Sequence, residues 1–239
     1  VAIGSNSLTT DTKGKKSVAI GTNALATQNF TTLTDTFNTA VGHSAGTAVT
    51  TGAVNTLVGA LSGDAITTGD YNTTLGVSTL GANTASHKNT AIGGNSMVAF
   101  NVTTDTDTYN TAVGYGSGLS LTTGIQNTLI GGLAGDVLTD ADYNVAVGMS
   151  ALGADTLGSK STALGYSALT AQNFTTATDS YNTAVGYAAG AAVTTGTLNT
   201  LIGGLAGDAL NTGGQSVAVG YEALSTEDGN GESVAVGYR

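Results

Sequence analysis

Aliphatic and polar residues alternate in a five-residue phrase that returns throughout the chain. The phrase reads Asn or Ser, then Thr, Val or Ala, then a small or aliphatic residue, then Val, Ile or Leu, and finally Gly, as in Asn38–Gly42. Because the side chains of a strand alternate between two faces, both faces of this phrase are apolar or small. The pattern predicts short strands covered on both sides, on one by the interior of their own coil and on the other by a partner surface.

The spacing of the phrase glycines defines the architecture. There are fourteen of them: Gly4, Gly21, Gly42, Gly59, Gly76, Gly93, Gly114, Gly131, Gly148, Gly165, Gly186, Gly203, Gly220 and Gly237. Their spacing is 17 residues, with three intervals of 21 residues. A unit this short is one coil of a solenoid, which buries its apolar residues only against a stacked neighbour.

We therefore predict an all-β fold, a parallel β-solenoid (β-roll) of about 14 coils that fills residues 1–239 as a single domain. After each glycine come a second short segment and a turn rich in Gly, Asn, Asp and Thr, so two short strands are expected in each coil. The absence of Pro suits strands that use every N–H in a ladder. No segment has helical periodicity. No atypical capping coil is visible, so we expect the chain to be part of a longer protein.

The longer intervals divide the chain into three cassettes, 22–93, 94–165 and 166–237. Each cassette has one long coil with four additional residues, which we call its insertion. The insertions contain the segments Gln28–Thr32, Phe100–Thr104 and Gln172–Thr176. Stacked coils keep a common cross-section, so the additional residues should project outward and carry glycans or partner contacts.

Charge and composition exclude several partners. The net charge of -10, with only 6 Lys and Arg, opposes binding to nucleic acid or to an anionic membrane. The basic cluster Lys13, Lys15 and Lys16 is interpreted as a solvated loop. The chain has no Cys, so it forms no disulfide framework and no thiolate metal site. No apolar run approaches the ~20 residues of a membrane helix, and no signal peptide is present.

Three phrases, Ser17–Gly21, Ser216–Gly220 and Ser233–Gly237, resemble the head repeat of trimeric autotransporter adhesins (YadA-like). The longer segment Asn182–Gly190 is similar to repeats of phage tail fibres and related bacterial surface proteins. The resemblance implies left-handed parallel β-rolls, three chains packed about one axis, and a role as a rigid adhesive head. The coils here are longer than the adhesin repeat, and a single-chain solenoid is the alternative to the trimer.

Few residues suggest chemistry. His43 and His87 occupy different places in the coil without a repeated partner, so both are interpreted as exposed residues rather than as metal or catalytic sites. Asp64, Asp136 and Asp208 recur once per cassette, which is typical of turn residues and not of a calcium loop. We predict no enzyme activity, no metal and no cofactor.

Two surface features remain open at this point. The residues Tyr115, Tyr166, Tyr187, Tyr221 and Tyr238 follow the phrase, as rungs that cover the solenoid or as a glycan-binding stripe. Four Asn-x-Ser/Thr triplets are candidate glycosylation sites: Asn29, Asn101 and Asn173, one in each insertion, and the isolated Asn72. Duplication of a Thr-rich loop explains the recurrence as well as glycan decoration does.

The sequence favours a non-catalytic structural or adhesive fibre module of a bacterial surface adhesin, an extracellular filament or a phage tail fibre. Such a module acts outside the cell, at the cell surface or on a virion, associates with itself, and contacts a host surface or glycan. One alternative is a glycan-binding or glycan-cleaving tailspike, which needs a carboxylate pair that the sequence does not place.

A second alternative is an ice-binding solenoid, suggested by a threonine at the second phrase position. This ladder comprises Thr39, Thr56, Thr73, Thr90, Thr111, Thr128, Thr162, Thr183 and Thr200, and it is interrupted by Val18, Val145, Val217 and Val234. Burial explains such Thr-to-Val exchanges better than ordered surface hydroxyls do. We also expect the fourth phrase position to be buried, including Val41, Val58, Ile92, Val113, Ile130, Val147, Val185, Ile202 and Val219.

Overall fold

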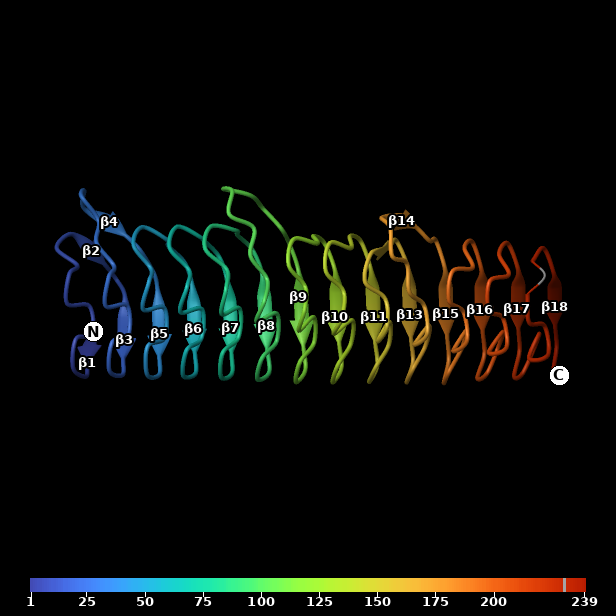
Figure 1. The fold of residues 1–239 in the computed structure, drawn as a ribbon. Helices are drawn as coiled ribbons and strands as arrows, with labels where there is room; N and C mark the ends of the chain where they lie inside the picture. The colour runs from blue at the N-terminus through green and yellow to red at the C-terminus, as the bar shows by residue number, and fades with distance from the viewer. Residues whose placement is uncertain (230) are drawn as a thin grey trace. The chain divides into compact units, whose positions relative to one another are not determined.

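The computed structural model describes residues 1–229 and 231–239, which form two compact units, Val1–Gly116 and Ser117–Arg239. Each unit is a parallel β-solenoid whose coils each contribute one short strand to a continuous sheet (Figure 1). The described residues contain fourteen such strands, seven in each unit, and no helix. The predicted β-solenoid of about 14 coils is confirmed.

In the first unit the strands are β1 (Ala2–Ile3), β2 (Gly14–Lys15), β3 (Val18–Ile20), β4 (Thr34–Asp35), β5 (Thr39–Val41), β6 (Thr56–Val58), β7 (Thr73–Leu75), β8 (Thr90–Ile92) and β9 (Thr111–Val113). Its main sheet has the order β1-β3-β5-β6-β7-β8-β9, and β2 pairs with β4 beside it. All pairs are parallel, and residues at the same phrase position pair with one another, as Thr39 does with Thr56.

In the second unit the strands are β10 (Thr128–Ile130), β11 (Val145–Val147), β12 (Gly158–Ser159), β13 (Thr162–Leu164), β14 (Thr178–Asp179), β15 (Thr183–Val185), β16 (Thr200–Ile202), β17 (Val217–Val219) and β18 (Val234–Val236). Its main sheet has the order β10-β11-β13-β15-β16-β17-β18, and β12 pairs with β14. The register is again set by the phrase, since Ala184 pairs with Leu201.

Coil positions are counted here from the first residue of the phrase, so that in coil 38–54 Asn38 is position 1 and Gly42 is position 5. The last residue of each coil, Val54 in this case, is called the junction residue. Positions 7 and 9 and the junction adopt positive φ, with values of 55° at Ser44, 57° at Gly46 and 59° at Val54. This conformation turns the chain and ends extended structure. The expectation of two strands in every coil is therefore wrong for most coils of the described chain.

The burial of the strand differs from the predicted register. Position 1 and position 3 face the interior, and Asn38 and Ala40 are fully buried, whereas positions 2 and 4 point outward. The prediction that position 4 is buried is wrong: Ile130 is 37% and Ile202 is 40% exposed, and the other predicted residues, Val41, Val58, Ile92, Val113, Val147, Val185 and Val219, are half-buried. The side-chain period of two makes the choice of face all or none, and the buried asparagine decides it.

Asparagine at position 1 links successive coils. The N–H of Asn55 donates to Oδ1 of Asn38 at 2.9 Å, and the N–H of Asn72 donates to Oδ1 of Asn55 at the same distance. The side-chain Nδ2 of Asn55 donates to the carbonyl of Gly69 at 2.8 Å. A buried amide is stable only when its donors and acceptors are paired, and this ladder pairs them in each coil with the next one.

The phrase glycine is fixed by two constraints. Gly59 has φ +129°, which side chains rarely allow, and a Cβ built on it would lie 2.2 Å from the carbonyl oxygen of Gly76 in the next coil. The other phrase glycines that are followed by a coil in the same unit show the same close approach. Stacking therefore requires glycine at position 5.

The core is filled by exchange of volume between positions 3 and 9. Leu57 at position 3 occupies the space beside Gly46 and Gly63 at position 9, where an added Cβ would come within 2.6 Å and 2.9 Å of its methyl carbons. In coil 17–37 the arrangement is reversed, because Ala19 stands at position 3 and Leu25 at position 9, and both are fully buried. Such complementary filling keeps the cross-section constant.

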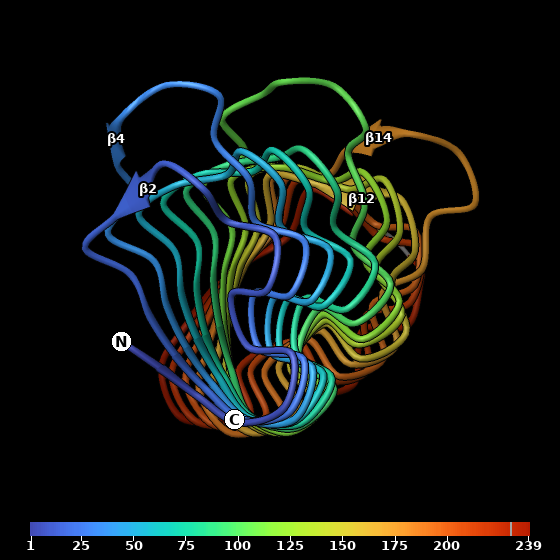
Figure 2. The ribbon, with the colours of Figure 1, turned by 90° about the vertical axis from the view of Figure 1, so that its left-hand side faces the viewer.

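The insertions project as predicted, although each is anchored at its base. In the first unit the loop that carries β4 and the loop between β8 and β9 extend beyond the outline of the other coils (Figure 2). In the second unit the loop that carries β14 does so. Leu33 at the first tip is 71% exposed, but Phe30 and Phe174 are only 7% and 6% exposed, so these phenylalanines hold two of the insertions against the solenoid.

Candidate functional site: an outward face and three insertions

The largest feature of the surface is an apolar outward face. It consists of positions 2, 4 and 6 and the junction, on the side of each main-sheet strand that points away from the interior. The described residues include 26 exposed large hydrophobic side chains, of which 24 lie at these four positions and only Leu33 and Leu61 lie elsewhere. Segregation of this kind marks a surface that binds a partner.

Charge is also distributed unevenly. Positions 2 and 4 carry no charged residue in any coil, although the chain has a net charge of -10. Position 2 is threonine or valine and position 4 is valine, isoleucine or leucine throughout. The centre of the outward face is therefore neutral and largely aliphatic within each unit.

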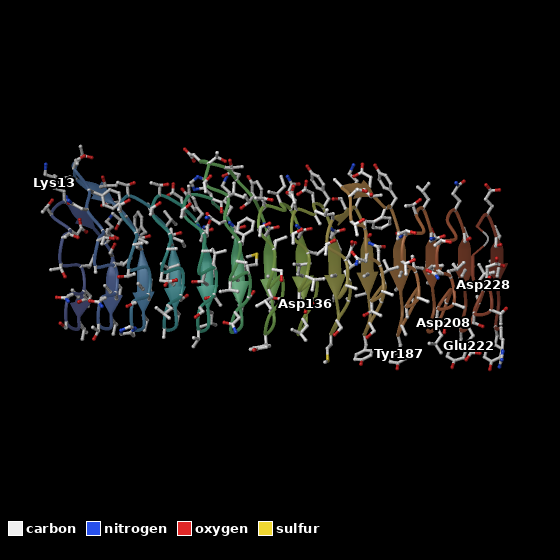
Figure 3. The ribbon with its side chains drawn as sticks, viewed as in Figure 1. Lys13, Asp136, Tyr187, Asp208, Glu222 and Asp228 are labelled. Carbon is white, nitrogen blue, oxygen red and sulfur yellow. The ribbon has the colours of Figure 1, made fainter. Side chains whose placement is uncertain are left out.

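The tyrosines at position 6 lie at one border of this face and are exposed. Tyr187 extends away from the ribbon of its coil (Figure 3) and stacks on Tyr166, with ring centroids 5.4 Å apart. Tyr221 stacks on Tyr238 at 5.6 Å, and its ring covers Gly204 on the side of the preceding coil. Both faces of Tyr221 are thus occupied, which disfavours a glycan stacked on that ring.

Each insertion is held by a lysine, an aspartate and an aromatic ring. Lys16, Lys88 and Lys160 are junction residues of the coils that precede the long ones, and each donates to an aspartate of the insertion. The pairs are Lys16–Asp35 at 2.7 Å, Lys88–Asp107 at 2.5 Å and Lys160–Asp179 at 2.5 Å. Each ammonium also lies over a ring, that of Phe37 at 5.0 Å, Tyr109 at 5.1 Å or Tyr181 at 5.2 Å.

The hydrogen bond from Lys88 lowers the pKa of Asp107, and the bond to Asp107 raises the pKa of Lys88. The recurrence of these residues every 72 residues is visible in the sequence, but their pairing is not obvious from it. The signal is a lysine followed by aspartate 19 residues later and by an aromatic residue 21 residues later. Since these pairs are exposed, they position the insertion more than they stabilise the fold.

A buried carboxylate supports the third insertion from below. Asp155 is fully buried and accepts hydrogen bonds from the N–H of Gly158 at 3.0 Å and of Phe174 at 3.1 Å. The side-chain amide of Gln172 donates to its other oxygen at 2.5 Å. Burial raises the pKa of Asp155. In the first unit Asp11 contacts Gly14 and Gln28 in the same way, and sequence reasoning identified neither aspartate.

The candidate glycosylation sites fall into two groups. Asn29 and Asn173 are exposed and Asn101 is half-buried, and their Oδ1 atoms accept hydrogen bonds from Thr12, Thr156 and Thr84 of the preceding coils. Asn72 is fully buried in the asparagine ladder, and its Nδ2 donates to the carbonyl of Ser86 at 3.0 Å. A glycan on Asn72 is incompatible with the folded coil, so this candidate is withdrawn.

The histidines and the basic cluster are only partly as predicted. His43 is exposed, but His87 is 8% exposed, so the interpretation of both as exposed residues is wrong for His87. Lys13, Lys15 and Lys16 are exposed as expected. Lys13 donates to the carbonyl of Thr31 at 2.7 Å, so the cluster also borders the first insertion.

The recurrent turn aspartates are half-buried. Desolvation by burial raises the pKa of Asp64, Asp136 and Asp208. Within the described residues, Oδ1 of Asp208 is buried without a hydrogen-bond partner. Among the same residues, no group of three or more His, Asp or Glu side chains is arranged to hold a metal ion.

The search for a bilayer-spanning helix and the comparisons with known proteins gave no match. The part of the chain that the structure describes has no helix that is long and apolar enough to span a bilayer. No family model, no curated protein and no solved structure matches the chain.

Proposed function

We propose that this chain is a non-catalytic structural and adhesive fibre module, a β-roll segment that assembles with copies of itself and presents its insertions to a partner. The single observation that carries the proposal is the collection of 24 of 26 exposed large hydrophobic side chains on the outward face. A face of this extent is unstable in water unless another surface covers it. Under this proposal the segment belongs to a surface adhesin, an extracellular filament or a phage tail fibre.

The occupant that fits the outward face is a second and a third copy of the chain. Two chains with a net charge of -10 repel each other except where they meet through an uncharged surface, and positions 2 and 4 supply that surface. A parallel copy has the same coil spacing, so every coil can meet a coil of its neighbour. A closed ring of three copies would cover the face completely, in agreement with the resemblance to trimeric adhesins.

The insertions are the natural partner-binding elements of such a fibre. They project from their units, and their tethering lysines and aspartates fix them in place (Figure 2). Loops that a rigid scaffold positions are the usual carriers of binding residues. A host surface or a glycan outside the cell is the partner we propose for them.

The mass of the protein in solution tests the assembly. We expect sedimentation equilibrium to give three times the chain mass of 23.3 kDa. The double variant Ile130→Lys, Ile202→Lys should be a folded monomer, because both side chains point outward from the coil. Leu33→Lys is the matched control, since Leu33 is exposed outside the outward face, and it should keep the parental mass. A monomeric parent protein contradicts the proposal.

The structure also favours one second candidate, the ice-binding solenoid. Threonines at position 2 point outward and are half-buried or exposed, as at Thr183 and Thr200, so burial no longer accounts for the ladder. Their in-register pairing presents a regular column of hydroxyl and methyl groups. An open outward face is required for this activity, so a monomer with measurable thermal hysteresis would favour ice binding over the fibre.

A further inference from the structure

His87 connects the second insertion to the solenoid through both of its ring nitrogens. Nδ1 accepts the backbone N–H of Asp70 in the preceding coil at 2.8 Å. Because that nitrogen is an acceptor, the ring proton is on Nε2, which faces Oδ1 of Asp105 in the insertion. The His87 side chain is only 10% exposed and that of Asp105 is 92% exposed, so a buried imidazole holds an exposed loop.

Neighbouring coils perform the same backbone contact with groups that do not bind a proton near neutral pH. In the first unit the N–H of Ala53 donates to Oδ1 of Asp70 at 2.6 Å. In the second unit the N–H of Asp142 donates to Oγ of Ser159, the residue that corresponds to His87 in the third cassette. The residues that correspond to Asp105 are Leu33 and Ala177, which carry no carboxylate. The titratable connection therefore belongs to the second cassette.

We propose that His87 is a pH-dependent latch for the second insertion, with the imidazolium form holding the loop more tightly than the neutral form. Histidine gains its second proton between roughly pH 8 and pH 5. Protonation of Nδ1 places an N–H against the N–H of Asp70 and removes that hydrogen bond. The contact with Asp105 meanwhile becomes a charge-assisted hydrogen bond, which is shorter and stronger than a neutral one.

The charges around the ring favour this rearrangement. Oδ2 of Asp70 lies 4.0 Å from Nδ1 and is placed to accept the new proton after a small rotation. Asp107 of the insertion forms a bridge with His87 and interacts with it electrostatically, while its carboxylate is also paired with Lys88. The groups that face the imidazole are thus three carboxylates, those of Asp70, Asp105 and Asp107, and one ammonium, that of Lys88.

Two readouts should move in opposite directions as pH falls from 8 to 5. A spin label on Thr104→Cys should become less mobile, which single-site labelling can measure because the chain has no Cys. The backbone amide of Asp70 should exchange roughly fivefold faster than its intrinsic rate predicts, since it loses one hydrogen bond. A label on Thr176→Cys in the third insertion is the matched control, and its mobility should not change over this range.

The variant His87→Ser reproduces the arrangement of the third cassette and should abolish both responses while keeping the fold. Circular dichroism before and after the pH change checks that the fold is kept. If the Thr104 label shows no change, or if the change persists in His87→Ser, the latch is wrong. If His87→Ser does not fold, His87→Asn provides a side-chain acceptor for the Asp70 N–H and must give the same loss of pH response. The readouts are local, so they test the latch even if the assembly proposed above fails.

Discussion

The backbone N–H of Asn72 donates to Oδ1 of Asn55 across two successive coils at 2.9 Å. The two residues are 17 positions apart in the sequence, and both are fully buried. This contact is repeated in the second unit, where the N–H of Asn144 donates to Oδ1 of Asn127 at 3.0 Å. It determines which side of the phrase lies inside.

Replacement of Asn55 by Ala should lower the free energy of unfolding by about 3 kcal/mol, because it leaves the N–H of Asn72 and the carbonyl of Gly69 buried without their partners. Urea denaturation measures the loss. Thr56→Ala, one residue later on the outward side, should change stability by less than ~1 kcal/mol. Equal losses in the two variants would contradict the structural role of the ladder.

Replacement of Gly59 by Ala should prevent normal stacking, because the new Cβ would lie 2.2 Å from the carbonyl oxygen of Gly76 and φ is +129°. We expect a loss of about 3 kcal/mol or more, seen as a lower melting temperature. Gly132→Ala is the control, since nothing lies within 4 Å of its added Cβ. A Gly59→Ala protein with parental stability would show that the coils can separate without cost.

Adjacent residues of β10 should respond differently to the same charge. Leu129→Asp places a carboxylate in the interior, where Leu129 is fully buried, and should unfold the second unit at a cost of several kcal/mol. Ile130→Asp points outward and should keep the fold while it weakens self-association. Circular dichroism and sedimentation separate the two effects. Unfolding of Ile130→Asp without loss of Leu129→Asp structure would reverse the assigned register.

The stability of the fold should depend on pH with opposite sign at Asp155 and Asp107. Burial raises the pKa of Asp155 above its model value of 3.8, so its contribution to stability is present below pH 3.8 and is lost as pH rises through the folded pKa. Lys88 lowers the pKa of Asp107 below 3.8, so that contribution is present above pH 3.8 and is lost as pH falls through the folded pKa.

The substitutions Asp155→Asn and Asp107→Asn test these signs. Relative to the parent, Asp155→Asn should lose its advantage as pH is lowered towards 3.8, whereas Asp107→Asn should lose its disadvantage as pH is lowered below 3.8. Asn83 occupies the position that corresponds to Asp155 in the second cassette and accepts the N–H of Ser86, so asparagine is tolerated there. Chemical denaturation at several pH values measures both slopes, and slopes of the same sign would contradict the assignment.

The sequence by itself determined the repeat, the parallel β-solenoid, the place of the strands and the outward projection of the insertions. These properties follow from local pattern and from the requirement that stacked coils share one cross-section. The glycine at position 5 shows why: its spacing is visible in the sequence, and each coil needs it for the same reason.

Only the tertiary structure decided which face of the strand is inside and which residues meet across coils. A period of two defines two faces but does not rank them, and aliphatic residues at position 4 suggested the wrong one. The buried partner of Asn55 lies one full coil away, and Lys88 meets Asp107 and His87 meets Asp105 only when the long coil returns beside the preceding one. Contacts of this kind depend on stacking, so a local pattern does not reveal them.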